Sequence, residues 1–282
     1  GALIRVSAVV GAMAAGAAAR KLGAIARYGE CLGLAFQVVD DILDKDGFCR
    51  AMSGKAAKAK AIRLIEQAKK TVKDFGAKGD GVTDDAVAIQ NAINSLPSTG
   101  GRVNVPAGTY MLGTSNGSLL TYPNGQPILC AIKITKDNVT FSGSGSTSVL
   151  KLMANKKMRA LCSTGHNNVI EKITVDGNAA QRASRDSTGK LYSWPDGYVV
   201  DGLVYLFGNN NAIVRDCEIR YGLEDGVGTW QTSGSLIQNC YVHDNGGYAY
   251  DPRSLYDAVA NGIALNAGTG NRALNNRVEK NT

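Results

Sequence analysis

The feature of this sequence that most limits its possible folds is a repeat of short apolar runs in the second half of the chain. Two such runs, residues 211–219 and 235–242, align on cysteines that lie 23 residues apart. A repeat of this kind is typical of a solenoid, in which each turn packs only on its neighbours. Its length corresponds to about one turn of a parallel β-helix, so we predict that fold.

Two further copies of the run lie at longer intervals. Residues 273–278 follow the matching part of the run 235–242 by 36 residues. Residues 169–175 precede the matching part of the run 211–219 by 44 residues. We attribute the extra length to insertions within residues 247–259 and 176–195. Alternating apolar residues predict a continuous core, and asparagines at matched positions predict hydrogen-bonded ladders between turns. Because the chain ends within this repeat, we expect a truncated solenoid without a C-terminal cap.

The composition fits a chain of many tight turns. Glycine accounts for 34 of the 282 residues, and the 44% apolar content excludes disorder as the main description. The net charge of +7 suits a polyanionic partner, which can be a nucleic acid, an anionic membrane or an acidic glycan. Much of the excess charge lies in residues 55–73, where helical spacing favours a solvated helix face.

The six cysteines show no Cys-x-x-Cys spacing, so we predict neither a zinc site nor a dense disulfide framework, and we expect buried thiols. Cys217 and Cys240 are expected to stack in the core as small apolar residues rather than as a disulfide. No apolar run reaches the roughly 18 to 20 residues that span a bilayer. Nor is a signal peptide predicted, because Arg5 interrupts the apolar opening and no basic segment precedes it.

The first part of the chain has a different pattern, with apolar residues at helical spacing. We predict helices over residues 2–18, 21–43 and 55–73, with a turn at Asp46-Gly47 between the last two. The pattern changes abruptly at Val72. We therefore expect a helical segment over residues 1–71 and a β-helical domain over residues 72–282.

Three aspartates in the second predicted helix form a candidate metal site. Asp40 and Asp44 share a helix face with Asp41 beside them, and such oxygen ligands suit a Mg²⁺ ion that bridges to a diphosphate. Over about the first 45 residues, the chain resembles the region of trans-isoprenyl diphosphate synthases around their second aspartate-rich motif. The resemblance implies Mg²⁺-dependent condensation of isoprenyl diphosphates. The family's first aspartate-rich motif has no counterpart in this sequence, so we interpret the segment as a fragment joined to another protein. Without the resemblance to this family, the three aspartates would be interpreted as a solvated acidic helix face.

Residues 72–110 begin the β-helical domain. Thr83 or Asp84 is expected to cap a helix over residues 85–96, and residues 100–110 predict a strand, a turn and a strand. This run resembles the entry segment of the pectate-lyase-like superfamily, which includes polygalacturonases, rhamnogalacturonan-active enzymes, mannuronan epimerases and phage tailspikes. The resemblance implies a mainly β, right-handed parallel β-helix that is extracellular and acts on an acidic polysaccharide.

Carboxylates gather on two adjacent turns of the predicted solenoid, in residues 220–226 and 243–246. Hydrolysis of a glycosidic bond needs two carboxyl groups that flank the bond. Glu224, Asp225 and Asp244 are the candidates for such a pair.

The same two turns also contain groups for a lyase or an epimerase, which needs a base and an acid around C5 and a cation near the uronate carboxylate. Tyr221 and His243 are candidates for the acid–base pair, and Arg220 or Arg253 for the cation. His243 can equally be a turn histidine that is hydrogen-bonded to its neighbour, Asp244.

The segment 173–178, together with Tyr221-Gly222 and residues 243–246, resembles the bacterial mannuronan C5-epimerase module more than the polygalacturonases. In that family Asp-Pro-His follows the site tyrosine, whereas Gly222-Leu223-Glu224-Asp225-Gly226 follows Tyr221 here. Tyr221 therefore matches the site tyrosine of the family, and Glu224 stands where the family has the aspartate. The site histidine of the family has no counterpart in this sequence. The polygalacturonase motifs are not reproduced either.

The predicted insertions carry further candidate sugar contacts. Basic and aromatic side chains of the insertions that are expected to bind substrate are Lys190, Tyr192, Trp194 and Arg253, and outside the insertions Tyr198 and Trp230 are further candidates for stacking on sugar rings. Asp201, Asp225 or Asp244 can supply a Ca²⁺ site. We therefore predict a β-helix that acts on an acidic polysaccharide, and not on nucleic acid, as an epimerase, lyase or hydrolase. The alternatives are a non-catalytic glycan-binding or tailspike-like module and an isoprenyl diphosphate synthase fragment.

Overall fold

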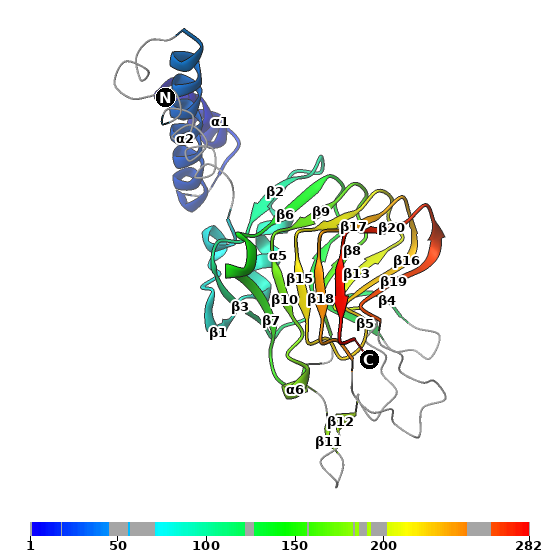
Figure 1. The fold of residues 1–282 in the computed structure, drawn as a ribbon. Helices are drawn as coiled ribbons and strands as arrows, with labels where there is room; N and C mark the ends of the chain where they lie inside the picture. The colour runs from blue at the N-terminus through cyan, green and yellow to red at the C-terminus, as the bar shows by residue number, and fades with distance from the viewer. Residues whose placement is uncertain are drawn as a thin grey trace. The chain divides into compact units, whose positions relative to one another are not determined.

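Figure 1 shows the fold in a computed structural model of the chain. The residues that the structure describes are 2–17, 19–44, 56, 71–121, 127–156, 158–182, 184–185, 191–192, 202–246 and 261–281. The chain divides into two compact units, Gly1–Lys70 and Thr71–Thr282. Each unit is described by itself below.

The first unit contains two described helices, α1 (Ala2–Ala14) and α2 (Ala19–Asp44). They approach closely, because a Cβ atom added at Gly29 would lie only 2.7 Å from the Cα atom of Arg5. Both helices were predicted, although α1 ends four residues earlier than expected. Neither they nor any other described helix is long and apolar enough to cross a bilayer. The turn at Asp46-Gly47 and most of the third predicted helix lie outside the described residues.

The second unit opens with a short entry segment. It comprises η1 (Val72–Phe75), β1 (Asp80–Asp84), α5 (Ala86–Asn94), β2 (Gly101–Asn104) and β3 (Gly108–Leu112). The strand–turn–strand prediction is thereby confirmed. Ile89 and Ile93 of α5 are buried in the main core, which gives this helix its place at the start of the solenoid.

The predicted cap of α5 is wrong by one or two residues. The N-cap is Asp85, and its side chain makes no capping hydrogen bond. Its carboxylate instead accepts hydrogen bonds from the backbone N–H groups of Lys78 and Gly79, at 2.7 and 2.9 Å. Asp85 therefore fixes the preceding loop rather than the helix end.

Three parallel sheets form the wall of the solenoid (Figure 1). Sheet 1 consists of β1, β3, β7 (Ser148–Leu152), β10 (Thr174–Asp176), β15 (Glu218–Arg220), β18 (Tyr241–His243) and β21 (Arg277–Glu279). Sheet 2 consists of β4 (Ser118–Thr121), β5 (Pro127–Ile134), β8 (Arg159–Ser163), β13 (Val204–Phe207), β16 (Val227–Ser233) and β19 (Ile263–Thr269), with β4 antiparallel. Sheet 3 consists of β2, β6 (Val139–Ser142), β9 (Val169–Glu171), β14 (Ile213–Arg215), β17 (Leu236–Gln238) and β20 (Arg272–Leu274). The remaining elements are η2 (Gly145–Thr147), α6 (Ala179–Arg182) and the pair β11 (Ser184–Arg185) and β12 (Leu191–Tyr192).

The strand register confirms the repeat read from the sequence. Thr174 pairs with Glu218, Glu218 with Tyr241, and Tyr241 with Arg277. These pairings reproduce the predicted intervals of 44, 23 and 36 residues. The predicted right-handed parallel β-helix, preceded by a short helical segment, is therefore confirmed.

Asparagine ladders join successive turns, as predicted. At one corner of the solenoid the Asn167 side chain donates to that of Asn138 at 3.1 Å, and Asn211 donates to Asn167 at 3.2 Å. All three residues have a left-handed backbone, with φ between 55° and 57°. Asparagine adopts this conformation more readily than most residues, so the ladder and the turn geometry favour the same side chain.

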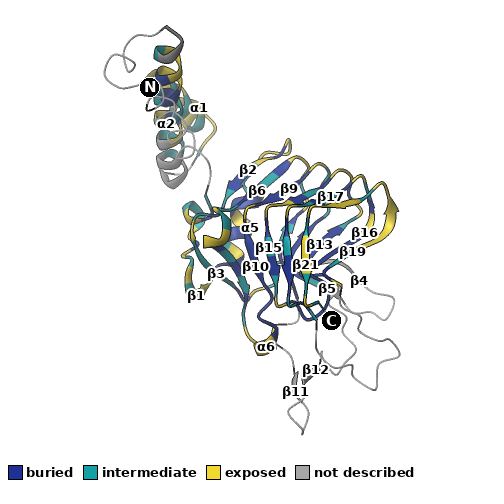
Figure 2. Cartoon of the chain, in the orientation of Figure 1, coloured by how far each residue is buried: buried dark blue, intermediate teal, exposed yellow. Residues whose placement is uncertain are grey.

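The interior of the solenoid is one continuous apolar core, drawn dark blue in Figure 2. Cys217 and Cys240 are buried in it as free thiols, as expected. Cys130 and Cys162 form a disulfide, however, which the expectation of buried thiols missed. They lie on the adjacent strands β5 and β8, in a small cluster with Tyr205 that is separate from the main core. Their spacing matches none of the repeat intervals, so the sequence did not indicate this pair.

The disulfide predicts a difference in thiol content. In denaturant without reductant, the protein should show two fewer titratable thiols than after full reduction, because Cys130 and Cys162 are joined. A colorimetric thiol assay on both samples measures this. The Cys130→Ser/Cys162→Ser double variant should show the same count in both samples. Equal counts for the original chain would contradict the pairing.

Sheet 3 carries an ion-pair cluster on its outer face. The buried carboxylate of Glu171 accepts hydrogen bonds from Arg102 at 2.8 Å, Ser142 at 3.0 Å and Arg215 at 2.6 Å. Burial by itself raises the pKa of Glu171, but the bonds from Arg215, Ser142 and Arg102 outweigh it and lower the pKa below its usual value. The charged form of Glu171 therefore links four successive turns, those of β2, β6, β9 and β14.

Replacing Glu171 with glutamine should lower the free energy of unfolding at neutral pH by about 1 to 3 kcal/mol, because hydrogen bonds to a charged group are lost. A carboxylate with a depressed pKa stabilises the fold above its unfolded-state pKa and loses that effect as the pH falls through its folded-state pKa. The difference in the free energy of unfolding between the original chain and Glu171→Gln should therefore become smaller in acid. Urea titrations at several pH values test this, with the exposed Asp216→Asn as control. A difference that is constant with pH would contradict the assignment.

Candidate functional site

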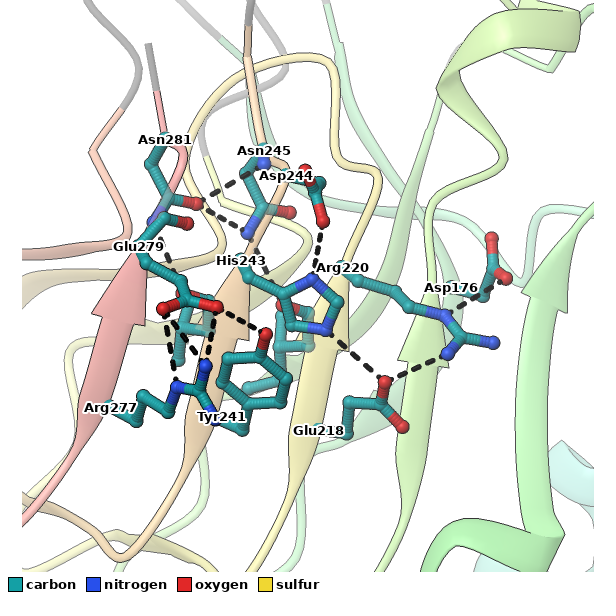
Figure 3. Close-up of polar contacts among 12 residues, drawn as sticks. Asp176, Glu218, Arg220, Tyr241, His243, Asp244, Asn245, Arg277, Glu279 and Asn281 are labelled. Atoms are coloured by element: carbon teal, nitrogen blue, oxygen red, sulfur yellow. Dashed lines mark hydrogen bonds and ion pairs between the residues drawn. The ribbon is translucent and has the colours of Figure 1, made fainter.

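A row of charged and aromatic side chains covers the outer face of sheet 1 (Figure 3). On its strands the central residues Val175, Ile219 and Val242 point into the core and are buried. The flanking residues therefore face outward, because successive side chains alternate between the two faces of a strand. The register aligns one outward row as Asp176, Arg220, His243 and Glu279.

Arg220 is held between two carboxylates. Its guanidinium lies 2.7 Å from Glu218 and 3.4 Å from Asp176, and Lys151 lies 3.9 Å from the same oxygen of Asp176. Thr174 donates a further hydrogen bond to Glu218 at 3.0 Å. Burial alone raises the pKa of Glu218, but the hydrogen bond with His243 and the charge of Arg220 outweigh it and lower the pKa. Glu218 is therefore a carboxylate that stays ionised.

His243 is almost fully buried and has a carboxylate beside each ring nitrogen. Nδ1 lies 2.6 Å from Asp244, and Nε2 lies 3.2 Å from Glu218. An ionised carboxylate only accepts hydrogen bonds, so both contacts form together only when both nitrogens carry a proton. A neutral ring leaves one nitrogen able to accept a proton. The site thus positions His243 for proton transfer.

Tyr241 lies between His243 and the last turn. Its ring stacks on the imidazole with centroids 3.9 Å apart, and the guanidinium of Arg277 lies 4.6 Å from its centroid on the same sheet. Its hydroxyl donates to Glu279 at 2.5 Å. This hydrogen bond raises the pKa of Tyr241 above its usual value. Tyr241 is therefore suited to positioning the imidazole and is a poor candidate for a base.

Tyr221 occupies a strained position at the corner after β15. Tyr221, Asp244 and Lys280 follow paired strand ends on three turns, with φ of 55°, 52° and 53°. Among the described residues with a positive φ, Tyr221 is the only aromatic one. The left-handed conformation costs a residue other than glycine roughly 1 to 2 kcal/mol. Such strain is often retained where function requires it.

The strained turn exposes the Tyr221 ring next to the row. The side chain is 41% exposed, and its ring meets the His243 ring edge-on, with centroids 6.1 Å apart. The Arg220 guanidinium lies 5.4 Å from the Tyr221 centroid. A phenol, an imidazole and a guanidinium thus converge at one corner of the solenoid.

The structure separates the predicted site residues into groups. It brings Arg220, Tyr221, His243 and Asp244 together, as described above. Glu224 and Asp225 follow in the same corner but are both 8% exposed. Asp225 accepts hydrogen bonds from the backbone and side chain of Asn261, at 2.6 and 3.1 Å, which links it to the next turn.

The other predicted contacts lie elsewhere. Trp230 is on β16 in sheet 2, away from the row on sheet 1. Lys190, Trp194, Tyr198, Asp201 and Arg253 lie outside the described residues, and Tyr192 is described only in its backbone.

Four residues on the outer face of sheet 1 were missed from the sequence: Asp176 and Glu218 as partners of Arg220, Glu279 as the partner of Tyr241, and Tyr241 as the stacking partner of His243. The repeat intervals were the available signal. Steps of 44, 23 and 36 residues from Asp176 lead to Arg220, His243 and Glu279. These intervals alone would therefore have aligned the outward positions.

Neither candidate metal site gains support from the geometry. Within the described part of the chain, no group of three or more His, Cys, Asp or Glu side chains is arranged to hold a metal ion. Asp40 is exposed on α2, and the Asp44 side chain lies outside the described residues. Of the candidate calcium ligands, Asp225 is bonded to Asn261 and Asp244 to His243.

The strain at Tyr221 predicts the effect of replacing it. Tyr221→Asn should raise the free energy of unfolding by up to about 1 kcal/mol, because asparagine tolerates the left-handed conformation better than tyrosine. Tyr241→Asn, in the adjacent strand, should lower it, because a stacked ring is lost from regular β structure. Urea denaturation of both variants measures this. Marked destabilisation by Tyr221→Asn would show that Tyr221 is there for packing.

Comparison with known proteins gives two matches to family models. The model "Rhamnogalacturonase A/epimerase, pectate lyase-like" matches residues 70–278, and the model "Polyprenyl synthetase" matches residues 1–60. Both agree with the resemblances noted from the sequence.

Individual relatives match the β-helical part. Mannuronan C5-epimerase AlgE1 of Azotobacter vinelandii is 32% identical over 220 residues, which cover 72% of this chain and 14% of that protein. Alginate lyase 7 of the same organism is 31% identical over 191 residues, which cover 62% of this chain and 19% of that protein. The chain thus spans less than a fifth of either relative.

A solved structure supports the same fold. ORF18 of Geobacillus virus E2 superposes with a TM-score of 0.50 at 24% identity, covering 79% of this chain and 43% of that one. Since the first family model matches about three quarters of the sequence, the chain belongs to the rhamnogalacturonase A/epimerase, pectate lyase-like family.

Proposed function

We propose that the β-helical unit acts on a uronate-containing polysaccharide and removes the proton at C5 of a uronate ring, as an epimerase or a lyase. The observation that carries this proposal is the exposed, strained Tyr221 beside His243 and Arg220. Tyrosine and histidine are both able to transfer protons, and their rings meet here, with Tyr221 exposed and His243 largely buried.

The chemistry requires three functions. A base removes the proton at C5, and the electron pair of that bond moves into the adjacent carboxylate as an enolate. A nearby cation stabilises the added negative charge. An epimerase returns a proton to the opposite face of C5, whereas in a lyase the electron pair re-forms as a double bond and expels the glycosidic oxygen, which takes up a proton.

The residues of the corner match these functions. We assign Tyr221 and His243 as the acid–base pair. Arg220 lies beside Tyr221 and pairs in register with His243, and because its charge is shared with Glu218 and Asp176, its main role is to hold the pair in place. Lys280 follows Tyr221 and Asp244 in the same column of turns and is exposed, so it supplies a cation for the uronate carboxylate.

Hydrolysis fits the corner less well. A glycosidase needs one carboxylic acid that stays protonated, and therefore one with a raised pKa. The pKa of Glu218, the carboxylate in contact with His243, is lowered instead. Asp225 is committed to Asn261 on the next turn. The carboxylates of the site are thus engaged as hydrogen-bond acceptors.

The named relatives support alginate as the first substrate to test. They are described as a mannuronan C5-epimerase and an alginate lyase. The histidine that follows the tyrosine in the epimerase motif is absent here, and Gly226 stands in its place. We propose that His243, one turn further along, supplies the imidazole.

The reaction type can be read from the products. The protein is incubated with polymannuronate, polyguluronate and pectate in deuterated buffer. Epimerisation gives new guluronate signals with deuterium at C5, a lyase gives unsaturated uronate absorbance, and a hydrolase gives reducing ends without that absorbance. Retention of a polymer without any product would identify a non-catalytic binding module and overturn the proposal.

Tyr221→Phe should reduce kcat by about 10²- to 10⁴-fold, the usual range for loss of a general acid or base. Tyr241→Phe is the matched control, because it also removes one hydroxyl from a ring next to His243. We expect kcat of Tyr241→Phe to fall by less than about tenfold, because the hydroxyl of Tyr241 contacts Glu279. Equal losses in the two variants would refute the assignment of Tyr221.

A further inference from the structure

An aromatic cluster lies on the outer face of sheet 2 and takes no part in the site on sheet 1. Phe207 on β13 pairs directly with Trp230 on β16, so their side chains are about 5 Å apart at the backbone. The Tyr205 ring stacks on that of Phe207, with centroids 6.4 Å apart and planes 16° from parallel. Tyr205 is buried and Phe207 partly buried, whereas Trp230 is 44% exposed. The buried rings thus support one exposed indole.

The backbone bends directly after this row on three successive turns. Gly208, Gln231 and Ala267 follow Phe207, Trp230 and Asn266, with φ of 62°, 54° and 42°. The conformation is unstrained only for the glycine. Gln231 and Ala267 keep it at a cost of roughly 1 to 2 kcal/mol each. The repeated bend fixes where the strand segment that carries Trp230 ends.

Two exposed side chains beside the indole are polar and uncharged. Asn266 pairs with Trp230 on the adjacent strand and is exposed, and Gln231 follows Trp230 and is also exposed. Amide groups both donate and accept hydrogen bonds, as sugar hydroxyls do. An aromatic face packs well on the apolar C–H face of a pyranose ring. This combination fits the ring of a sugar better than an extended apolar partner.

We infer that Trp230, Phe207, Gln231 and Asn266 form a second glycan-binding site, which holds a pyranose ring remote from the reacting one. The inference rests on the proposed function for its ligand class, a uronate polysaccharide, but not for the chemistry at Tyr221. Trp230 lies on sheet 2, nine residues after Tyr221 in the chain. We expect a long polymer to contact both sites, and a short oligosaccharide only one. Two linked contacts increase the apparent affinity without changing either site.

Binding of polymannuronate and of mannuronate trimers, measured by calorimetry, tests the inference. Trp230→Ala should weaken binding of the polymer by about tenfold, the loss of one well-packed aromatic contact. Trp230→Phe should retain part of the affinity for the polymer that Trp230→Ala loses. In both variants KM for the polymer should follow the change in affinity, while kcat and the binding of trimers stay as in the original chain. Tyr28→Ala, which removes an exposed ring from α2, is the control and should have no effect.

The outcomes separate this inference from the proposed function. If the original chain binds the polymer through Trp230 but forms no product, the second site stands and the acid–base assignment fails. If the chain converts the polymer but Trp230→Ala binds it as tightly as the original chain, the second site is refuted. Absence of polymer binding by the original chain, or Trp230-dependent binding of a neutral glucan alone, would also refute it. Thermal unfolding of each variant confirms that Trp230→Ala remains folded.

Discussion

The structure depends on the in-register pairing of parallel strands from one turn to the next. Each residue of a turn lies about 4.8 Å from its equivalent on the next turn, so equivalent side chains are always neighbours. Inside the solenoid this stacks valine on isoleucine on valine, as in Val175, Ile219 and Val242. Outside it, like charges on equivalent residues would repel. The alternation of Asp176 and Arg220 along sheet 1 satisfies that constraint.

The same constraint defines the chemistry available at the site. An outward arginine or histidine necessarily has its neighbours on the adjacent turns within reach: Arg220 contacts Asp176, and His243 contacts Glu218. These contacts hold the groups in place but also occupy them. Tyr221 differs because it lies after the strand, in a corner where the ring turns outward. The groups on the strands are therefore held by their neighbours, whereas the ring of Tyr221 in the corner is exposed.

Much of the fold could be predicted from the sequence because a solenoid repeats. The interval between Cys217 and Cys240 fixed the register of β15 and β18, and the two longer intervals located the insertions. Arg220, Tyr221, His243 and Asp244 could be assigned to neighbouring turns on the same basis. The aromatic and ionic partners Tyr241 and Glu218 could have been found, since they obey the same intervals.

Other features could not be predicted, because they do not follow the repeat. The disulfide joins Cys130 to Cys162 across two turns that contain different insertions, so no shared interval relates them. The role of Asp85 depends on where the loop at Lys78 and Gly79 folds back, which is a tertiary contact. The location of Trp230 on a different sheet from His243 depends on the chain turning a corner between Tyr221 and Val227. Neighbours in sequence thus face different sides of the molecule.

The column of turns that contains Tyr221, Asp244 and Lys280 has a consequence for how such a protein changes over time. The backbone is almost the same at all three positions, although an aromatic, an acidic and a basic residue occupy them. The turn therefore keeps its shape with three different kinds of side chain, although the left-handed backbone costs each of them some stability, and each position contacts mainly the turns beside it. A single codon change there can alter the local chemistry while the register of every strand is preserved. Diversification of activity on this scaffold needs no new fold, only substitution along one edge.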